Sequence, residues 1–446
     1  MRDEGPMTRR TTGGPKAIAA NAAAFWFLGV FPVLGVLFNR GHMGIAAIGL
    51  AVCAGIAVAD YGSKPTLAKM AEAWRPPYAS VVWAVLFLCA LAMLSAMWAF
   101  DGPFALQKSA SLFGVLLIAA AAGAFMSGSD PSKAAFFGFS GLLLASLFLA
   151  EEAIGPAYFS SWKIFFDHPQ WAIGTDGNAR LLDHYLMQLN RSVVTVSILL
   201  WPVGFMLWHR GRRIMLALLL LIALPAIAMS FSQSAIFGLA AGSVAALATM
   251  VVGRIAVYGL AAAIMVLAAE APLIFKVMPG IAGDFLVSAA GGGGAGERLV
   301  IWEAFAESIY QKPILGWGAD AGRFFGREGI PAEHVPTGWP DAIWHHPHNG
   351  FLQGWVDFGI FGGFAVGAIF AAAALAIARL PAPLRPSALG CLAASAAVTL
   401  VSHGLWQTWS LMLMGLAAAL FVWLAKTITL ERGLADALSK ADRPCA

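Results

Sequence analysis

Long apolar segments dominate this chain of 446 residues and leave it few ways to fold. Twelve of them have about the 20 residues that a helix needs to cross a hydrocarbon layer. Inside that layer the backbone must satisfy its own hydrogen bonds, and an α-helix does so within one segment. Charged residues make up only 12% of the chain, about half the share in soluble domains. We therefore predict an all-α polytopic membrane protein, with about 12 transmembrane helices in one integral-membrane domain over residues 1–446.

The connections between the predicted helices are short except at two places. The predicted helices are 17–38, 43–59, 79–99, 109–127, 134–151, 192–208, 214–231, 233–252, 255–274, 350–377, 387–403 and 406–425. A shorter loop over 152–191 follows the fifth helix, and a longer loop over 275–349 separates the ninth helix from the tenth. Helices are usually joined by a few residues, and long connections often carry function. The chemistry is therefore expected on the side of the membrane that these two loops share.

Basic residues are distributed unevenly between the two sides. If the N-terminus is cytoplasmic, 18 of the 28 Lys and Arg residues lie on the cytoplasmic side, where the connections are also shorter. The positive-inside rule then predicts that both termini are cytoplasmic and that both long loops are periplasmic. The net charge of +4 is too balanced to indicate binding to nucleic acid. Membrane lipid is the partner that the composition predicts.

The longer loop contains one helical pattern, over about 297–311. Arg298, Trp302, Phe305 and Ile309 recur at intervals of four, three and four residues, which places them on one face of a helix. Two interpretations remain open. The amphipathic helix lies in the membrane interface with the arginine at its start, or it packs on the bundle with that arginine solvated.

Three of the nine histidines gather just before the tenth helix. His345, His346 and His348 lie within four residues, and Asn349 follows. A neutral imidazole in this place can act as a general base near physiological pH. A zinc site is disfavoured, because Pro347 breaks helical ligand spacing and the sequence has no HExxH motif or cysteine partner. Catalysis or substrate binding is the favoured interpretation, and a solvated surface cluster is the alternative.

Two more polar groups are predicted at the same depth on the same side. Asn190 and Arg191 end the shorter loop, and the segment 230–234, which includes Gln233, separates the seventh and eighth helices. Each has a simpler explanation. An arginine at a helix end can extend to the lipid headgroups, and serines between two spans can form a turn. Convergence with the histidines on one side favours a shared site.

Two stretches of the sequence resemble the O-antigen ligase and polymerase superfamily. They are RLVIWEAFAESIYQKPILGWG at Arg298–Gly318 and HPHNGFLQGWVDFGIFGG at His346–Gly363. The family pattern has an arginine and a tryptophan, a proline and G-x-G, a long outer loop, and a His-Asn pair followed by a leucine, an acidic residue and glycines. The helix start at Asn190–Ser192 is similar to a third family feature. Two positions depart from the pattern: Gln233 stands where many members have arginine, and Asp357 where many have glutamate.

The resemblance implies a metal-independent, inverting glycosyltransferase of the bacterial inner membrane that needs no cofactor. Its donor is then a glycan linked to undecaprenyl pyrophosphate. The acceptor is lipid A core in an O-antigen ligase, which we favour, or a growing glycan in a polymerase. A protein O-oligosaccharyltransferase is a further alternative. A polysaccharide transporter is disfavoured, because nearly all charges lie at the ends of predicted spans rather than at mid-membrane.

Residue roles follow from this chemistry. The departing pyrophosphate gains negative charge, and Arg191 and Arg298 are predicted to bind it, because guanidinium groups pair with phosphate oxygens through two donors. With that positive charge in place, no metal is expected. His348 matches the family's histidine before asparagine, so we predict that it is the catalytic base for the acceptor hydroxyl. Four other residues are predicted to contact substrate: Asn349, His346, Gln233 and Trp302.

Overall fold

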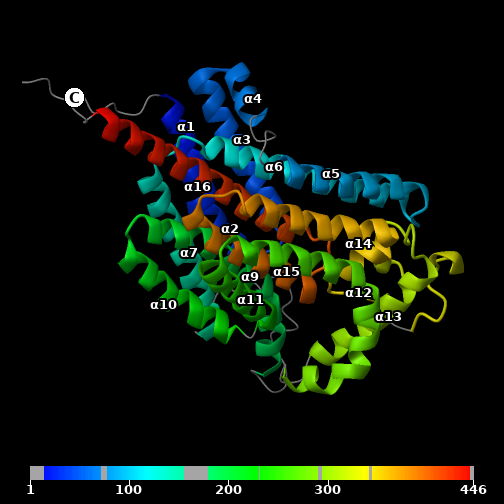
Figure 1. Cartoon of the computed structure of the whole chain (residues 1–446). Helices are drawn as coiled ribbons and strands as arrows, with labels where there is room; N and C mark the ends of the chain where they lie inside the picture. The colour runs from blue at the N-terminus through cyan, green and yellow to red at the C-terminus, as the bar shows by residue number, and fades with distance from the viewer. Residues whose placement is uncertain are drawn as a thin grey trace, which may run out of the picture.

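The computed structural model describes residues 15–71, 78–154, 179–230, 232–289, 294–340 and 344–441, and the regular structure in these ranges is helical. Eleven of the described helical segments are long and apolar enough to cross a membrane. A shorter apolar helix, Arg213–Met229, stands where the seventh span is predicted. Figure 1 shows these helices packed side by side. The prediction of an all-α polytopic membrane protein is confirmed.

The helices follow the predicted order along the chain. The first half forms α1 (Pro15–Ala24), the π-helical turn η1 (Phe25–Val30), α2 (Phe31–Leu37), α3 (His42–Tyr61), α4 (Ser63–Ala71), α5 (Ala79–Leu94), α6 (Gly102–Met126) and α7 (Pro131–Ile154). The second half forms α9 (Ala179–His209), α10 (Arg213–Met229), α11 (Gln233–Val252), α12 (Arg254–Ala289), α13 (Gly294–Gln311), α14 (Gly350–Ile377), α15 (Arg385–Val401) and α16 (Thr408–Ala441). The first three elements together make one span.

Several helices are longer than predicted. The predicted loop over 152–191 is helical from Ala179, because α9 begins there, and α12 continues to Ala289 rather than ending at 274. α16 likewise runs on past residue 425. Hydropathy marks where the apolar run ends, whereas the backbone hydrogen bonds of a helix continue through polar residues. Pro272 and Pro279 lie inside α12 without ending it.

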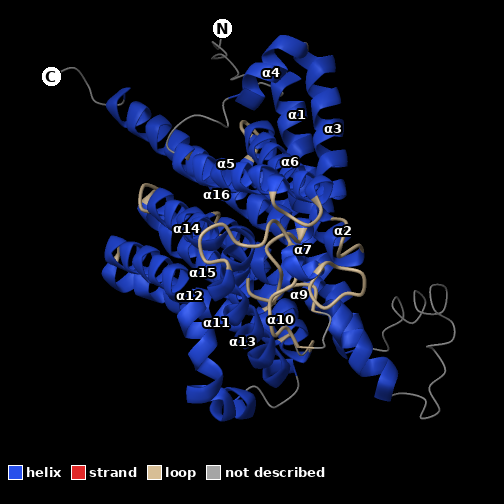
Figure 2. Ribbon diagram, turned by 90° about the vertical axis from the view of Figure 1, so that its right-hand side faces the viewer, coloured by secondary structure: helices blue, strands red, loops and turns tan. Residues whose placement is uncertain are grey.

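Successive spans run in opposite directions, so every second connection lies at the same end of the bundle. We call this the loop end; its residues are 38–41, 95–101, 230, 232, 312–340, 344–349 and 402–407. α13, which follows α12 directly, also lies there. Figure 2 shows α1, α4 and the far end of α16 toward the opposite end of the molecule from α13. Residues far apart in the sequence therefore meet at the loop end.

α13 packs one face on the bundle, which is the second of the two interpretations left open above, except that Arg298 is half-buried rather than solvated. Trp302, Phe305 and Ile309 are buried, and the helix packs against α12 and α14. On the other face, Val300 and Tyr310 are exposed. The inward face belongs to a hydrophobic core that also includes aromatic residues of α14. This core therefore holds α13 against α14 at the loop end.

α14 contains a break that receives the G-x-G segment of the longer loop. Phe358 and Gly359 are non-helical, and Gly359 has φ 58°. The freed backbone groups bind the loop: Gly318 N–H donates to the Asp357 carbonyl at 2.8 Å, and Ile360 N–H donates to the Pro313 carbonyl at 2.9 Å. A Cβ on Gly359 would lie 2.3 Å from the Ile314 carbonyl oxygen. The glycines of the motif therefore let two backbones meet.

Gly359→Ala is expected to destabilise the protein strongly. A left-handed alanine costs about 1–2 kcal/mol on its own, and the contact with the Ile314 carbonyl adds to that cost. The matched control is Gly44→Ala in α3, where a Cβ meets nothing within 4 Å and alanine is the better helix former by about 1 kcal/mol. Thermal unfolding in detergent should show a clear drop for Gly359→Ala and none for Gly44→Ala. Equal unfolding temperatures would contradict the packing described for the break.

Candidate functional site

The histidine segment before α14 is a turn fixed at both ends. His348 has a left-handed backbone, φ 54°, a conformation that persists only where the surroundings hold it. Trp302 of α13 donates its indole N–H to the Pro347 carbonyl at 2.9 Å. Asn349 accepts a bond from Leu352 N–H at 3.0 Å and so caps α14. These contacts on both sides of His348 fix the backbone that carries its side chain.

The imidazole of His348 is oriented by a backbone carbonyl. Its Nδ1 lies 2.9 Å from the carbonyl oxygen of Ser402, and a carbonyl can only accept, so Nδ1 carries the proton. In the neutral ring Nε2 is then the basic nitrogen. Burial is the main cause that lowers the pKa of His348, and the charge of Arg298 lowers it further, while the Ser402 bond opposes both. The ring is thus neutral at physiological pH, with Nε2 able to accept a proton.

His346 lies against His348 and is neutral as well. Their ring centroids are 4.2 Å apart, and the backbone N–H of His348 donates to His346 Nδ1 at 3.1 Å. Gln407 contacts the other ring nitrogen at 3.1 Å. Burial, followed by His348, lowers the pKa of His346 to about 3. His346 therefore supports the position of His348 without adding charge.

Residues from three other segments reach the same place through the loop after α15. Asn190 of α9 donates its side-chain N–H to the Ser402 hydroxyl at 3.2 Å, and that hydroxyl lies 2.9 Å from His403 Nε2. The side-chain oxygen Oδ1 of Asn190 accepts from the Ser232 hydroxyl, and from the Ser234 hydroxyl of α11 at 3.0 Å. Polar groups before α14, at α9, at α11 and after α15 therefore form one connected cluster.

Arg191 and Arg298 both act on this cluster. Burial is the main cause that lowers the pKa of His403 well below its ordinary value, and the positive charges of Arg191 and Arg298 lower it further. Contacts place both arginines here: the Trp409 ring that Arg191 faces lies 4.6 Å from the His403 ring, and Arg298 precedes Trp302, which bonds to Pro347, by one helical turn. Arg191 also stands over the Trp409 ring, with 5.9 Å from its central carbon to the ring centroid. The structure thus brings together the two arginines and His348, from α9, α13 and the turn before α14.

The arginines give the cluster an excess of positive charge. Both are half-buried, and within the described ranges neither forms an ion pair with a carboxylate. Glu297 is near enough to raise the pKa of Arg298, although burial lowers that pKa more. The buried Nε of Arg191 has no hydrogen-bond partner within the described part of the chain. Arginines keep their charge in proteins, so an anion is the ligand that this arrangement favours.

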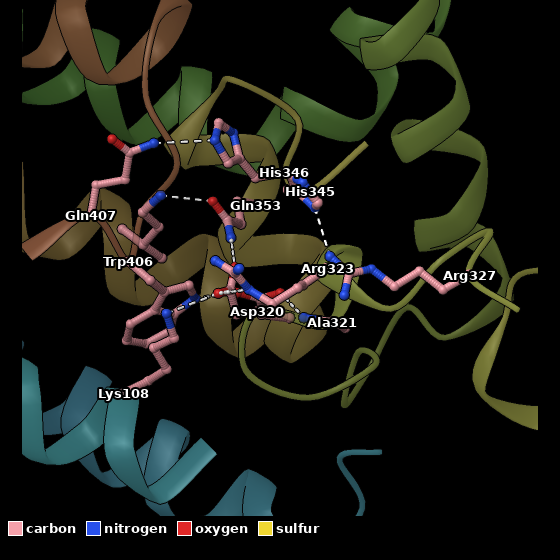
Figure 3. A network of polar contacts seen from close by, with 12 residues as sticks. Lys108, Asp320, Ala321, Arg323, Arg327, His345, His346, Gln353, Trp406 and Gln407 are labelled. Carbon is pink, nitrogen blue, oxygen red and sulfur yellow. Dashed lines mark hydrogen bonds and ion pairs between the residues drawn. The ribbon is translucent and has the colours of Figure 1, made fainter. Parts of the chain in front are cut away.

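A buried carboxylate beside the cluster ties several helices together. Asp320 is 3% exposed and lies 3.0 Å from Lys108 Nζ of α6 and 3.2 Å from Arg323 Nε. It also accepts a bond from Gln353 of α14 at 3.1 Å. Figure 3 shows Lys108 and Gln353 approaching Asp320 from different elements. Asp320 therefore joins the longer loop to α6 and α14.

A second buried carboxylate holds the loop after α15 in place. Trp406 donates its indole N–H to Asp357 at 2.6 Å, and Ala321 N–H donates to the other oxygen at 3.3 Å. The side-chain oxygen of Gln353 accepts from Leu405 N–H at 2.7 Å. These bonds fix the segment that carries Ser402 and His403, and through Ser402 they orient His348. Figure 3 shows Trp406 of this segment beside Asp320 and Gln353.

Asp320→Ala is expected to lower the free energy of unfolding by about 3–5 kcal/mol. It leaves the Lys108 side chain, which is only 15% exposed, without its carboxylate partner, and an unpaired charge that is mostly buried is costly. The control is Arg323→Ala, which removes the other cation at Asp320. The Arg323 side chain is 39% exposed, and exposed pairs contribute about 0–1 kcal/mol. Denaturant unfolding in detergent measures both variants, and similar small losses would rule out a structural role for the Lys108–Asp320 pair.

The remaining predicted site residues, which are Asn349, Trp302 and Gln233, differ in burial and in the groups they contact. Asn349 is fully buried and its side chain caps α14. Trp302 is 8% exposed and bonded to Pro347, so the structure gives it a supporting position, and a contact with substrate stays a prediction. Gln233 is the first residue of α11 and is exposed. Its role toward substrate also stays a prediction.

Sequence reasoning missed the loop after α15. The cluster includes Ser402, His403 and Gln407 from this loop. Asp320 and its partners, which lie beside the cluster, were not predicted either. A signal was available in the run SHGLWQTW at 402–409, where two spans are separated by a histidine, a serine and two tryptophans. The predicted helices 387–403 and 406–425 instead place most of this run inside two spans.

Over part of its length the chain is similar to known polysaccharide ligases. Residues 216–367 match the family model described as O-antigen ligase, a segment that includes Arg298, His348 and the break in α14 at Phe358 and Gly359. The chain is 22% identical over 227 residues to a Rickettsia typhi protein named "Putative polysaccharide ligase", which covers 50% of this chain and 55% of that protein. A Rickettsia conorii protein of the same description is 26% identical over 183 residues, 40% of this chain and 43% of that protein. The chain thus spans about half the length of the curated relatives that it matches.

Proposed function

We propose, from the confirmed resemblance of this chain to the O-antigen ligase superfamily, that it is a periplasmic-face glycosyltransferase of a bacterial inner membrane. It moves a glycan from undecaprenyl pyrophosphate to an acceptor hydroxyl on lipid A core. One observation carries the proposal. Two half-buried arginines without carboxylate partners in the described ranges lie beside a neutral histidine whose Nδ1 is bound to the Ser402 carbonyl.

The arginines bind the donor in this account. A pyrophosphate brings negative charge to the place where Arg191 and Arg298 are concentrated. It also supplies hydrogen-bond acceptors to guanidinium groups whose burial limits their contact with water. Paired N–H donors match phosphate oxygens, and their attraction is stronger in a site of low dielectric than in water. The same groups stabilise the charge that grows on the leaving oxygen during transfer.

His348 removes the acceptor proton. The acceptor hydroxyl donates to Nε2, its oxygen attacks the anomeric carbon, and the bond from that carbon to the pyrophosphate oxygen breaks. The proton stays on the imidazole and the electron pair leaves with the lipid pyrophosphate. A single displacement of this kind inverts the anomeric centre. The Ser402 carbonyl accepts from Nδ1–H throughout, which stabilises the imidazolium as it forms.

Reconstitution tests the proposed function. The purified protein in liposomes is given a lipid-linked glycan together with lipid A core, or with a second lipid-linked glycan. A ligase forms glycosylated lipid A core and releases undecaprenyl pyrophosphate. A ladder of longer lipid-linked glycans without lipid A core would identify a polymerase instead. If glycan is transferred to neither of the two acceptors, the proposal is overturned.

The pH dependence of transfer should report the buried histidine. Burial and Arg298 lower the pKa of His348 below its ordinary value of 6.5, and only the neutral ring can act as base. Activity should therefore persist as the pH falls through 6.5 and decline at lower pH. Arg298→Gln removes the positive charge and should move this decline to higher pH, in whatever activity the variant retains. A wild-type decline centred above pH 6.5 would contradict the assignment of His348 as the base.

A further inference from the structure

A group of basic side chains beside the histidine turn takes no part in the chemistry described so far. Lys108 of α6 and Arg323 of the longer loop both contact the carboxylate of Asp320, at 3.0 and 3.2 Å. Arg327 follows in the same loop and contacts Nδ1 of His345 at 3.0 Å. Figure 3 shows Arg323 beside Asp320 and Arg327 beside His345. Three cations therefore share one directly paired carboxylate.

The positive charge of this group exceeds the negative charge that is paired with it. Within the described ranges Arg327 forms no ion pair, and the exposed Glu328 that follows it pairs with neither arginine. Burial is the main cause that lowers the pKa of His345, and the charges of Arg327 and Arg323 lower it further. This neutral ring occupies one of several N–H donors of Arg327. Arg323 and Arg327, which we call the loop arginines, therefore keep donors for an anion from outside.

The loop arginines lie beside an apolar surface. Phe324 packs against Phe100 with ring centroids 5.0 Å apart, and Ala319 N–H donates to the Ser95 hydroxyl at 3.2 Å. The longer loop thus rests on the connection between α5 and α6. There Met97 is 84% exposed and Phe100 is 38% exposed. Exposed apolar side chains at the end of a membrane bundle adjoin hydrocarbon, and basic side chains next to them lie at the depth of lipid headgroups.

The loop arginines also lie next to the proposed base. His345, which Arg327 contacts, adjoins His346 in the sequence. The ring centroid of His346 is 4.2 Å from that of His348. An anion at the loop arginines is therefore held close to His348, but by a different segment from those that carry Arg191 and Arg298.

We propose that the loop arginines bind a phosphate group on the sugars of the membrane-bound acceptor and so present its hydroxyl to His348; this rests on the proposed function. A phosphorylated glycolipid combines the two features that this surface offers, because it carries anions beside hydrocarbon chains. Paired guanidinium donors match phosphate oxygens. The loop arginines are then positioning residues that select a phosphorylated acceptor, and no bond forms or breaks at them.

The first test measures acceptor binding without transfer. The protein in phosphatidylcholine nanodiscs is titrated with lipid A core, and with the same glycolipid after its phosphates are removed. Wild type should bind the phosphorylated form at least about tenfold more tightly, equivalent to 1.4 kcal/mol. A variant with both Arg323→Ala and Arg327→Ala should bind the two forms alike. Equal binding of both forms by wild type, or an unchanged preference in the double variant, would overturn the proposal.

Lys276→Ala is the matched control for this titration. The Lys276 side chain is 40% exposed and pairs with Glu307 of α13, whereas the Arg323 side chain is 39% exposed and pairs with Asp320. Both substitutions remove one ion-paired cation at the loop end. Lys276→Ala should keep the full preference for the phosphorylated form. The same loss in Lys276→Ala as in the double variant would show that overall charge is responsible, and would overturn the assignment.

A competition experiment separates the acceptor from bulk membrane lipid, which also carries phosphate. Phosphatidylglycerol is added to the same nanodiscs while lipid A core is bound. The proposal predicts that it displaces far less of the bound acceptor than an equal amount of unlabelled lipid A core does. Equal displacement would assign the loop arginines to lipid headgroups in general and would overturn the proposal.

The last test uses transfer in liposomes. Arg323→Ala should raise the KM for lipid A core by at least about tenfold, equivalent to 1.4 kcal/mol, and leave kcat and the KM for the donor close to wild type. The dephosphorylated acceptor should not distinguish the variant from wild type. The fold should survive, because this exposed pair contributes about 0–1 kcal/mol. A higher KM for the donor instead of the acceptor, or equal losses with both acceptors, would contradict the proposal.

These experiments separate the acceptor site from the proposed function. Binding of phosphorylated acceptor that depends on the loop arginines, in a protein that transfers no glycan, supports the site and removes the function. Transfer to lipid A core with an unchanged acceptor KM in the double variant supports the function and overturns the site.

Discussion

His348→Ala is expected to lower the rate of glycan transfer by about 10²- to 10⁴-fold, the usual contribution of a general base. The structure presents Nε2 of this ring as the basic nitrogen, because Nδ1 is bound to the Ser402 carbonyl. Binding of the donor should change little, since the arginines remain. Single-turnover transfer in liposomes measures the chemical step apart from product release.

Two further variants control this result. His348→Asn removes the base but keeps a residue that tolerates the left-handed backbone at φ 54°, so it should be as inactive as alanine and better folded. His345→Ala removes an exposed histidine three residues away, which contacts Arg327 at 3.0 Å, and should transfer at nearly the wild-type rate. Wild-type activity in His348→Asn would exclude the proposed base.

Arg191→Ala and Arg298→Ala are each expected to reduce transfer by about 10²- to 10³-fold, the range for removing one preorganised donor to developing negative charge. Lysine should restore only part of this loss at either position. It carries the charge, but it lacks the planar pair of donors that matches phosphate. The measurement is kcat/KM for the lipid-linked donor, with Arg379→Ala as the control, because Arg379 is exposed at the far end of α14 from the cluster.

The arginine variants also distinguish two kinds of charge effect. If the groups act on pyrophosphate, both variants should weaken donor binding and slow the chemical step. Full recovery with lysine at both positions would indicate that general positive charge is enough, and that paired hydrogen bonds to phosphate play no part. Unchanged kcat/KM in either alanine variant would remove that arginine from the site.

Much of the fold follows from hydropathy alone. Apolar runs of membrane length predicted the spans, and the 3.6-residue period predicted the buried face of α13 (Gly294–Gln311). The ends of α9 and α12 were missed, because helical hydrogen bonding continues beyond the apolar residues that mark a span. The break at Gly359 was missed too, since it depends on the loop that inserts there.

Only part of the site was predictable, for a physical reason. Alternating spans predict that Arg191, Arg298 and His348 lie at one end of the bundle. In the structure His348 bonds to Ser402, Arg191 faces the Trp409 ring that contacts His403, and Arg298 precedes Trp302, which bonds to Pro347, by one turn. The directions of the spans predict the end of the bundle at which a residue lies, but not which other residues it contacts there. The bond from Ser402 to His348, and the pair of Lys108 with Asp320, join segments 54 and 212 residues apart. Such partners depend on packing, which residue types and spacing do not specify.

Binding of undecaprenyl pyrophosphate, measured beside transfer in the same liposomes, tests the central claim most directly. The account predicts that His348→Ala binds this lipid as tightly as wild type yet transfers almost no glycan. Arg191→Ala and Arg298→Ala should bind it at least about tenfold more weakly, equivalent to 1.4 kcal/mol. Wild-type binding in both arginine variants, or wild-type transfer by His348→Ala, would contradict a site in which two guanidinium groups hold the donor and one imidazole takes the acceptor proton.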